Sequence, residues 1–235
     1  MQLFFNANLK ELNQHLILDT NTSKHLVLVL RMKIGDNIGL TNGKGLHAVA
    51  EIVAAEKRDC IVRVVSCSEV TPRPYKLVMA VCFTKNKARN EWMLEKMTEI
   101  GVEVIIPVMA HRTEKEKFNH ERCNTILESA MLQSKQYYLP ELLQPHTINE
   151  LLKYEVAHRY IAHCEDDQPK MPLITTLIPS NDSMVLIGPE GDFTLEEISK
   201  ITAANIQPIS LGVNRLRTET AAIYACTIFN ALNYV

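Results

Sequence analysis

The chain lacks any long run of apolar residues. A membrane-spanning helix needs roughly 18 consecutive apolar residues, and no stretch of the 235 residues approaches that length. The first residues, Met1 to Asn8, carry neither a basic flank nor an extended apolar segment, so they do not have the pattern of a secretory signal peptide. We therefore expect that the protein does not associate with a membrane and that it is located in the cytoplasm.

An excess of charge of one sign is also missing. The sequence has 25 Lys and Arg against 27 Asp and Glu, which gives a formal net charge of −2. A chain balanced in this way has no overall attraction to the phosphates of a nucleic acid. If RNA is a partner, a local cluster of basic residues must bind it. With 46% hydrophobic and 22% charged residues, the composition is that of a folded globular protein and not of a disordered one.

The six cysteines and eight histidines form none of the spacings that are typical of metal or redox sites. Neither a C-x-x-C pair nor an H-E-x-x-H pattern occurs, so we expect no metal ion and no disulfide framework. Most of the cysteines lie within apolar runs, as buried reduced thiols do. No G-x-G-x-x-G motif follows a strand and opens a helix, which argues against a dinucleotide-dependent oxidoreductase.

The first seventy residues have the pattern of a small β domain. The apolar run at 26–30 and the alternating segment at 61–65 predict strands, and glycines between them indicate turns. Two prolines in the segment 71–74 favour extended backbone, as in a linker. We therefore predict a β domain over residues 1–71.

Residues 72–235 instead alternate between continuous apolar runs and helical segments. The helix expected at 90–100 is followed by Gly101 in a C-cap position, and another helix is expected at 121–136. The continuous apolar runs predict strands that are covered on both faces, at 77–81, 104–108, 160–163 and 184–187. The alternation predicts an α/β domain with a mainly parallel sheet and helices on both faces.

Two glycine-containing loops follow strands in this second domain. In the first, residues 187–194, Gly188 and Gly191 would let the backbone approach a ligand closely, and Thr194 with Glu197 has the signature of a capping box. Loops at the carboxyl ends of strands are where open α/β sheets bind ligands. A tight turn with no ligand is the alternative.

The second loop, residues 211–218, contains Gly212 and two arginines, Arg215 and Arg217, before a helix that Thr218 is expected to cap. Arginines placed before a helix favour the binding of an anion or an RNA phosphate. Ion pairs with Glu190 or Glu219 are the alternative. The last helix is apolar around much of its circumference, so it must pack against the sheet or a second subunit.

These two loops, in this order, resemble those of the RsmE family of small-subunit ribosomal RNA uridine-N3 methyltransferases. The first loop has the sequence Ile187-Gly188-Pro189-Glu190-Gly191, and the second contains Leu211-Gly212 and Arg215 to Ala221. The resemblance covers nearly the whole chain. It includes His25, Val29-Leu30-Arg31, Gly35-Asp36, Lys96, Glu99 to Val102, Pro107, Arg112, Gln133-Ser134 and Pro140.

The resemblance implies a SPOUT-type methyltransferase domain at 72–235 and a PUA-like β-barrel domain at 1–71 that recognises RNA. In this class the parallel sheet contains a deep trefoil knot, the protein is a homodimer, and the knotted loops hold S-adenosylmethionine. The implied substrate is a uridine of 16S ribosomal RNA within the small ribosomal subunit. The residues that match the cofactor loops are Ile187, Gly188, Glu190, Gly191, Leu211, Gly212, Leu216, Arg217 and Thr218.

The reaction implied by the family sets further requirements. Uridine N3 carries a proton, so catalysis needs either a base near N3–H or a cation that stabilises the negative charge developing on the ring. Arg217 is the candidate for the cation, and Glu219 could orient Arg217 or accept the proton. The target base must also be unpaired or flipped out of a helix. The candidates for RNA binding are Arg31, Lys85, Lys87, Arg89, Arg112, Lys117 and Lys135.

The sequence departs from the family pattern at two positions. Asp192 stands where the family often has a small residue, and we expect its carboxylate to face solvent or the start of the next helix. Gln136 stands where an arginine usually follows the Gln-Ser pair, and Lys135 could substitute as a point charge. His163 and Cys164, at the end of a strand, could line the cofactor pocket.

Two other functions stay open at this point. The chain could be a SPOUT methyltransferase that acts on another RNA, or an RNA-binding protein without catalysis. The second alternative predicts no affinity for S-adenosylmethionine, which the two glycine loops argue against.

Overall fold

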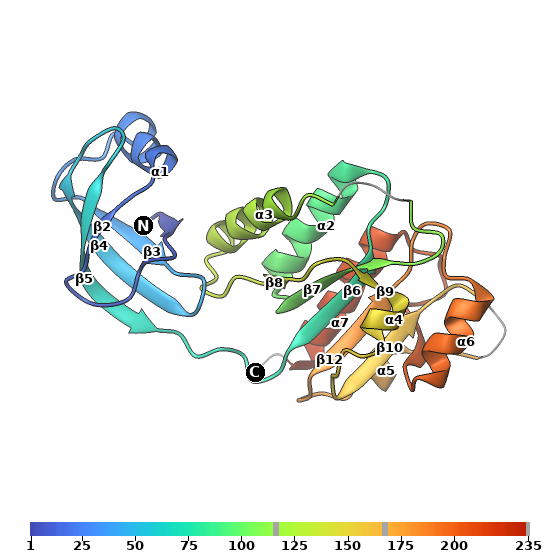
Figure 1. Ribbon diagram of the computed structural model, residues 1–235. Coiled ribbons are helices and arrows are strands. Elements are labelled where there is room, and N and C mark those ends of the chain that lie inside the picture. Colours follow the sequence, from blue (N-terminus) through green and yellow to red (C-terminus); the bar gives the residue numbers. More distant parts are fainter. Residues whose placement is uncertain (115–117, 166–168, 234–235) are drawn as a thin grey trace. The chain divides into compact units, whose positions relative to one another are not determined.

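The computed structural model describes residues 1–114, 118–165 and 169–233. The chain forms two compact units (Figure 1). The first contains Met1–Pro72 together with Met131–Leu139, and the second contains Arg73–Ala130 and Pro140–Val235.

The first unit is built on a five-stranded sheet in the order β1-β3-β4-β5-β2. Its strands are β1 (Leu3–Phe5), β2 (His15–Ile17), β3 (Asn37–Thr41), β4 (Leu46–Ala54) and β5 (Ile61–Glu69). β1 pairs with β3 in parallel, and the other neighbours are antiparallel. Every second residue of β4 from Ala48 to Ile52 is buried, so one face of this strand forms the core of the unit.

The strand predicted at 26–30 is wrong. Residues His25–Val29 form the π-helical turn η1, which continues the helix α1 (Thr20–Lys24). Asp19 starts this helix, because its Oδ1 accepts hydrogen bonds from the backbone N–H of Asn21 and Thr22 at 2.9 and 3.0 Å. A short apolar run does not by itself distinguish a strand from a helix, and here the N-cap Asp19, which lies before the run, determines the conformation.

Residues 131–139 belong to the first unit, although they lie far beyond the predicted boundary of the β domain at residue 71. Gly45 N donates to the carbonyl of Tyr137 at 2.8 Å, and Leu139 N donates to that of Gly43 at 2.9 Å. The Tyr138 hydroxyl donates to Val70 O at 2.7 Å. A Cβ on Gly45 would collide with the Tyr138 ring, and the φ of Gly45 is +93°. Glycine is therefore required at position 45 by both the close approach and the backbone conformation.

The second unit contains an eight-stranded sheet in the order β11-β13-β10-β12-β6-β7-β8, with β9 also paired to β7. Every pairing between its strands is parallel. The strands are β6 (Leu77–Cys82), β7 (Val104–Met109), β8 (Glu141–Leu142), β9 (His146–Thr147), β10 (His158–Ala162), β11 (Met171–Pro172), β12 (Ser183–Ile187) and β13 (Gln207–Ser210). All residues of β6 and β12 are buried, as the continuous apolar runs predicted.

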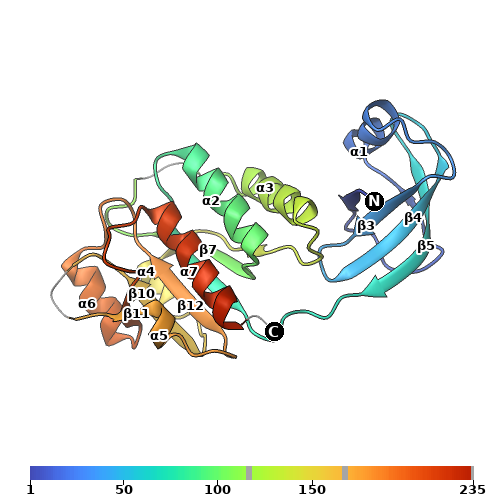
Figure 2. The same ribbon diagram turned by 180° about the vertical axis from the view of Figure 1, so that it is seen from behind.

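Helices cover both faces of this sheet (Figures 1 and 2). On one face α7 (Thr218–Asn233) packs against α2 (Lys87–Ile100), β6 and β12. On the other, residues of α4 (Ile148–Leu151) and α6 (Leu195–Ala203) join the core formed by β6, β7 and β12. The remaining helices are α3 (His120–Gln133) and α5 (Leu173–Thr176), which contacts α7. The predicted α/β class with a parallel sheet is confirmed, and the trefoil knot stays a prediction.

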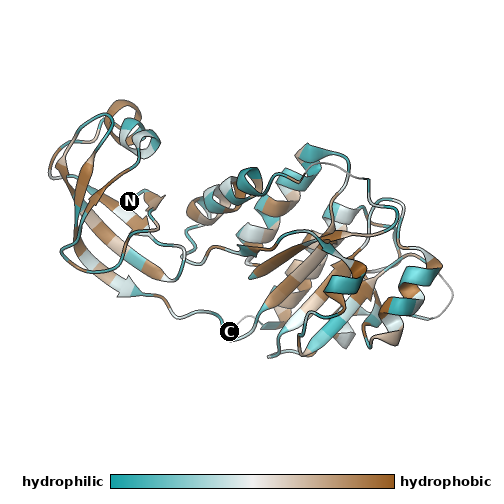
Figure 3. Ribbon diagram, viewed as in Figure 1, coloured by the Kyte–Doolittle hydropathy of each residue, from teal (hydrophilic) through white to brown (hydrophobic). Residues whose placement is uncertain are grey.

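The helix ends show how the sequence sets the elements near the site. α2 starts at Lys87, earlier than predicted, because the Asn86 side chain accepts a hydrogen bond from Arg89 N. Gly101 ends it with a φ of +104°, as predicted. Thr194 and Glu197 form the predicted capping box of α6. The strands of the larger sheet consist mainly of hydrophobic residues, as Figure 3 shows.

Candidate functional site

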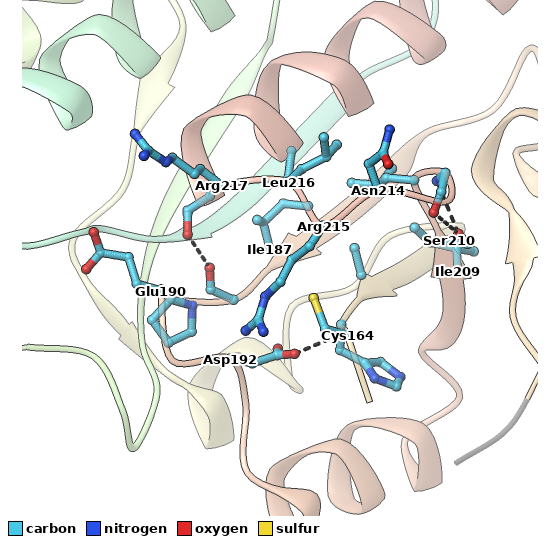
Figure 4. Close-up of a pocket in the computed structure, with 18 of the residues that line it drawn as sticks. Cys164, Ile187, Glu190, Asp192, Ile209, Ser210, Asn214, Arg215, Leu216 and Arg217 are labelled. Atoms are coloured by element: carbon cyan, nitrogen blue, oxygen red, sulfur yellow. Dashed lines mark hydrogen bonds between the residues drawn. The ribbon is translucent and has the colours of Figure 1, made fainter. Parts of the chain in front are cut away.

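Loops that follow three neighbouring strands line one hollow in the second unit (Figure 4). β13, β10 and β12 are adjacent and parallel in the sheet, so their carboxyl ends lie at the same edge. The hollow has a volume of about 860 Å³. This is the edge at which open α/β sheets bind ligands.

The residues predicted to bind a cofactor gather here, with Gly191 as the exception. The hollow is lined by Ile187, Gly188, Glu190, Leu211, Gly212, Leu216, Arg217 and Thr218. The loop after β10 contributes His163 and Cys164, the two residues at the end of a strand that could line the cofactor pocket. Lys170, Ser210, Asn214 and Arg215 also line it, and of these only Arg215 had been considered, as an anion contact or an ion-pair partner.

A hydrogen bond from the start of α7 connects the two glycine loops. Thr218 Oγ1 donates to Gly188 O at 2.9 Å, and the side chain is buried. Thr218 is thus not the N-cap, and that prediction is wrong. The carbonyl of Arg217 accepts the first helical bond, from Ala221 N at 2.8 Å, so Arg217 occupies the N-cap position. The Thr218 hydroxyl is used to hold the loops together.

Gly188 is required by the packing beneath it. A Cβ at this position would lie 2.9 Å from Cε2 of Phe193 and 3.2 Å from Oδ1 of Asp192. The Phe193 ring is fully buried in the core and has no space to move. The close approach, and not a turn conformation, therefore accounts for this glycine.

Asp192 was expected to face solvent or the helix start, and the structure places it elsewhere. Its side chain is buried, with a backbone φ of +61°. Oδ2 accepts a hydrogen bond from Cys164 N at 2.6 Å, and Oδ1 accepts one from Phe193 N at 2.8 Å. Asp192 thus joins the loop after β12 to the loop after β10. Desolvation and the nearby Asp192 carboxylate raise the pKa of the Cys164 thiol, which is therefore protonated at neutral pH.

The two arginines of the second loop point in different directions. Arg215 extends toward Asp192 and Cys164, whereas Arg217 lies on the same side of the hollow as Glu190 (Figure 4). Ion pairs with Glu190 and Glu219 were the alternative for Arg215 and Arg217. Among the described residues, Arg89 makes both of these ion pairs instead. Arg89 Nη1 lies 3.8 Å from Glu190 Oε1, and Arg89 Nε lies 3.6 Å from Glu219 Oε1.

Glu219 is therefore placed differently from the prediction that it orients Arg217. It does not line the hollow but lies behind Arg89, with a side chain that is 8% exposed. Its Oε2 is buried and has no hydrogen-bond partner among the described residues. No sequence pattern could have indicated this pair, because Arg89 and Glu219 are far apart in the chain and belong to α2 and α7.

The residues predicted to bind RNA do not form one cluster within the second unit. Lys85 and Arg89 line the hollow, Lys87 is exposed in the first turn of α2, and Arg112 Nη1 donates to Gly191 O at 2.7 Å. Arg31 and Lys135 belong to the first unit, where both have positive φ values. Lys117 lies outside the described residues.

The described ranges 1–114, 118–165 and 169–233 contain no helix with the length and hydrophobicity needed to cross a bilayer. In the same ranges no group of three or more His, Cys, Asp or Glu side chains is placed to hold a metal ion. All six cysteines are free, and Cys60, Cys82, Cys123 and Cys226 are buried as expected. Burial raises the pKa of Cys82 to about 12.

The chain is similar to known proteins over nearly its whole length. Residues 71–230 match the model of an RNA methyltransferase domain, and residues 18–65 match that of an RNA methyltransferase PUA domain. A ribosomal RNA small subunit methyltransferase E from Rickettsia conorii is 30% identical over 232 residues, which cover 95% of this chain and 92% of the relative.

Solved structures agree with this assignment. A probable rRNA-methyltransferase from Porphyromonas gingivalis superposes with a TM-score of 0.92 at 32% identity, covering 99% of this chain and 98% of the other. A ribosomal RNA small subunit methyltransferase E from Neisseria gonorrhoeae, bound to S-adenosyl methionine, gives a TM-score of 0.84 at 25% identity, with 99% and 98% covered. The extent of these matches confirms the resemblance, and the chain belongs to the RsmE family of ribosomal RNA small subunit methyltransferases.

Proposed function

We propose that the chain transfers the methyl group of S-adenosylmethionine to N3 of one uridine in 16S ribosomal RNA of the small ribosomal subunit. One observation supports this most directly. The two family loops, which are separated in sequence, are bonded to each other through Thr218 and Gly188 around a hollow at the carboxyl edge of the sheet. Because ribosomal subunits assemble in the cytoplasm, that is the proposed location.

The hollow suits a cofactor of this size. Its volume of about 860 Å³ lies within the usual range of roughly 300–1,000 Å³ for small-molecule sites. Ile187, Leu211 and Leu216 offer aliphatic contacts for an adenine ring. A Cβ at Gly212 would meet nothing within 4 Å, so the backbone there is open to a ligand. When bound, S-adenosylmethionine supplies a methyl group that is already activated by its sulfonium.

The protein must then lower the barrier at uridine N3. Arg217 lies at the N-cap of α7 and lines the hollow, so it can place a positive charge near the ring as negative charge develops. Glu219 does not line the hollow and would act only through a neighbour. Binding of the RNA falls to the predicted basic residues, with Lys85 and Arg89 adjacent to the reaction.

The proposal assigns different roles to the two parts of the chain. Residues 1–71 would recognise RNA, and residues 72–235 would bind the cofactor, catalyse transfer and form a homodimer. The chain has a match to a PUA domain in the first part and to a methyltransferase domain in the second, which supports this division. Light scattering of the purified protein tests the dimer.

The decisive experiment for the function is methylation in vitro. The protein is incubated with S-adenosylmethionine and small subunits from a strain that lacks the activity, and new methyl groups are mapped by nucleoside mass spectrometry. We expect a single 3-methyluridine in 16S RNA. Transfer only to another RNA would contradict the substrate, and failure of calorimetry to detect cofactor binding would contradict the enzyme itself.

The role of Arg217 has its own test. Replacing Arg217 with Ala should lower kcat by about 10²–10³, as removal of one preorganised donor does, while the Kd for S-adenosylmethionine changes little. Arg215→Ala is the matched control, since that side chain points to the other side of the hollow. Equal rates for wild type and Arg217→Ala would exclude this role.

A further inference from the structure

Three charged side chains from three different elements form a row beside the hollow. Glu219 of α7 contacts Arg89 of α2, and Arg89 in turn contacts Glu190 of the loop after β12. The N–O distances are 3.6 Å to Glu219 and 3.8 Å to Glu190, so these are charge contacts and not tight hydrogen bonds. The row connects a buried carboxylate to one that lines the hollow.

The Glu219 carboxylate, at the buried end of the row, is destabilising for the fold unless other groups compensate for its burial. A carboxylate removed from water is destabilising unless an opposite charge and hydrogen bonds offset the loss of solvation. Glu219 is 6% exposed, and its Oε2 has no hydrogen-bond partner among the described residues. Its Oε1 faces Arg89, which it holds toward the hollow. Arg89 is also fixed at its backbone, because its N–H donates to Asn86 Oδ1.

The exposed end of the row differs from the other carboxylate of the same loop. Both oxygens of Asp192 accept backbone hydrogen bonds, so Asp192 has a structural role. The Glu190 carboxylate makes no hydrogen bond among the described residues, and its side chain is 38% exposed. Its carboxylate is thus available to a ligand in the hollow.

Side by side, Arg89 and Glu190 present a hydrogen-bond donor next to an acceptor. This is the complement of the imide edge of uracil, where a carbonyl acceptor lies next to the N3–H donor. Cytosine lacks this pattern, because its N3 is itself an acceptor beside an amino group.

We propose that Glu190 and Arg89 read the imide edge of the target uracil, and that Glu219 is the positioning residue that holds Arg89 in place. This inference rests on the proposed function and names the residues that select the base. Glu190 accepts the N3 proton while Arg89 donates to the neighbouring carbonyl oxygen. Specificity for uracil over cytosine follows from the same contacts.

The proton and the electrons balance in this step. The N3–H bond breaks as its proton moves to a Glu190 oxygen, and the electron pair left on N3 forms the new N–CH₃ bond. The S–CH₃ bond breaks with its electron pair kept by sulfur, which turns the sulfonium into a neutral thioether. Arg89 stabilises the negative charge that develops on the carbonyl oxygen during the transfer.

The first test replaces Glu190 with Gln, which keeps the shape but cannot accept the proton. We expect kcat to fall by about 10²–10⁴, the usual contribution of a general base, and the Kd for S-adenosylmethionine in calorimetry to change far less than kcat. The matched control is Glu196→Gln, because Glu196 is exposed in the first turn of α6 and does not line the hollow. The control should methylate small subunits at the wild-type rate.

The pH profile separates a base from a structural residue. In Glu190→Gln the proton must leave to hydroxide, so the rate should rise by about tenfold per pH unit and approach wild type at high pH. The cations that line the hollow together with Glu190 are Lys85, Arg89, Lys170, Arg215 and Arg217, and of these Arg89 forms an ion pair with Glu190. Asp192, His163 and Cys164 also line the hollow, and Glu219 lies behind Arg89. Small subunits that contain 5-fluorouridine, whose N3 proton is more acidic, should likewise restore the rate.

The positioning role of Glu219 predicts a graded series. Glu219→Gln removes the charge that holds Arg89 and should lower kcat about tenfold, whereas Glu219→Asp retains the charge and should recover part of the loss. Arg89→Lys keeps a charge but loses the planar donors, and should reduce the preference for the target uridine over a cytidine placed at the same site.

The outcomes distinguish this inference from the proposed function. If wild type forms 3-methyluridine while Glu190→Gln loses rate and regains it at high pH, the proposal stands. If Glu190→Gln loses cofactor affinity in parallel with rate, or loses rate equally at every pH, the proposal is overturned although the function survives. If wild type forms no 3-methyluridine, the proposed function fails first.

Discussion

The loops that follow β12 and β13 line the same hollow but are held by the chain in very different ways. Gly188, Pro189, Asp192 and Phe193 of the first loop are buried. In the second loop Gly212 to Arg215 are exposed, and Val213 is 102% exposed. The first loop is therefore packed into the core without any ligand, whereas residues 212–215 of the second loop are left open to contact whatever binds in the hollow.

This difference implies that the two loops contribute to ligand binding in different ways. A preformed wall costs no ordering entropy when a ligand binds, and an exposed loop must lose mobility to contact it. Changes in the first loop should therefore affect the stability of the protein together with its affinity. Changes at the exposed positions 212–215 of the second loop should affect affinity alone. Four substitutions test this comparison, from the largest expected effect to the smallest.

Gly188→Ala should have the largest effect. The new Cβ would lie 2.9 Å from the buried Phe193 ring, so the loop or the core must shift. Overpacking of this kind costs about 1–3 kcal/mol, and the displaced backbone should weaken S-adenosylmethionine binding as well. Urea unfolding and calorimetry measure the two effects.

The matched control for this substitution is Gly191→Ala. The nearest atoms to a Cβ there are 3.4 and 3.5 Å away, on the Arg112 side chain, which can move. We expect its stability to stay within about 0.5 kcal/mol of wild type. Equal losses in the two variants would show that packing under Gly188 is not what makes the first loop rigid.

Thr218→Val removes the bond between the two loops. The buried Gly188 carbonyl would lose its donor, and an unsatisfied buried group costs about 1–3 kcal/mol. Because this bond is the attachment of the second loop to the first, cofactor affinity should fall too. Thr218→Ser keeps the hydroxyl and should retain most of the stability and most of the affinity for S-adenosylmethionine. A Val variant as stable as the Ser variant would mean that the bond does not hold the loops.

Asp192→Asn is expected to have an intermediate effect. The asparagine tolerates the positive φ of +61° but has one acceptor oxygen where the aspartate has two. One of the N–H groups of Cys164 and Phe193 would lose its partner, which costs about 1 kcal/mol. Chemical unfolding measures the loss, and Asp192→Ala should lose more than Asp192→Asn.

The same variant has a chemical readout at Cys164. The aspartate charge contributes to the raised pKa of the thiol, so wild type should react slowly with iodoacetamide at pH 8. In Asp192→Asn the pKa falls toward its ordinary value, more thiolate is present, and alkylation of Cys164 should be faster. Peptide mass spectrometry locates the label. An unchanged rate would show that desolvation, the larger cause, acts alone.

Much of the second unit could be predicted from the sequence, because its signals are local. Continuous apolar runs at 77–81 and 184–187 predicted buried strands, and Gly101 and Thr194 marked helix ends where the structure has them. The apolar run at 26–30 failed because its conformation depends on Asp19, outside the run. Local patterns predict well when the residues that determine an element lie within it.

The site was predictable to the extent that it is built from contiguous loops. The glycine loops were found from residue order and the family resemblance, and they do meet. The contact of Arg89 with Glu219 and the bond of Asp192 to Cys164 join residues that are distant in sequence. No periodicity or spacing encodes such pairs, since they arise from the packing of separate elements on one sheet.

Val213→Ser should have the smallest effect on stability and is the sharpest test of the comparison. Val213 is fully exposed, so its removal leaves no cavity, and the free energy of unfolding should change by less than about 0.5 kcal/mol. Val213 also lines the hollow, so a bound cofactor that contacts it would bury its methyl groups. The Kd for S-adenosylmethionine should then rise several-fold, by about 1 kcal/mol for the lost apolar contact. Unchanged stability with weaker binding means that the second loop gains its order from the ligand. Reduced stability would mean that the second loop is already packed without it, and the contrast between the two loops would disappear.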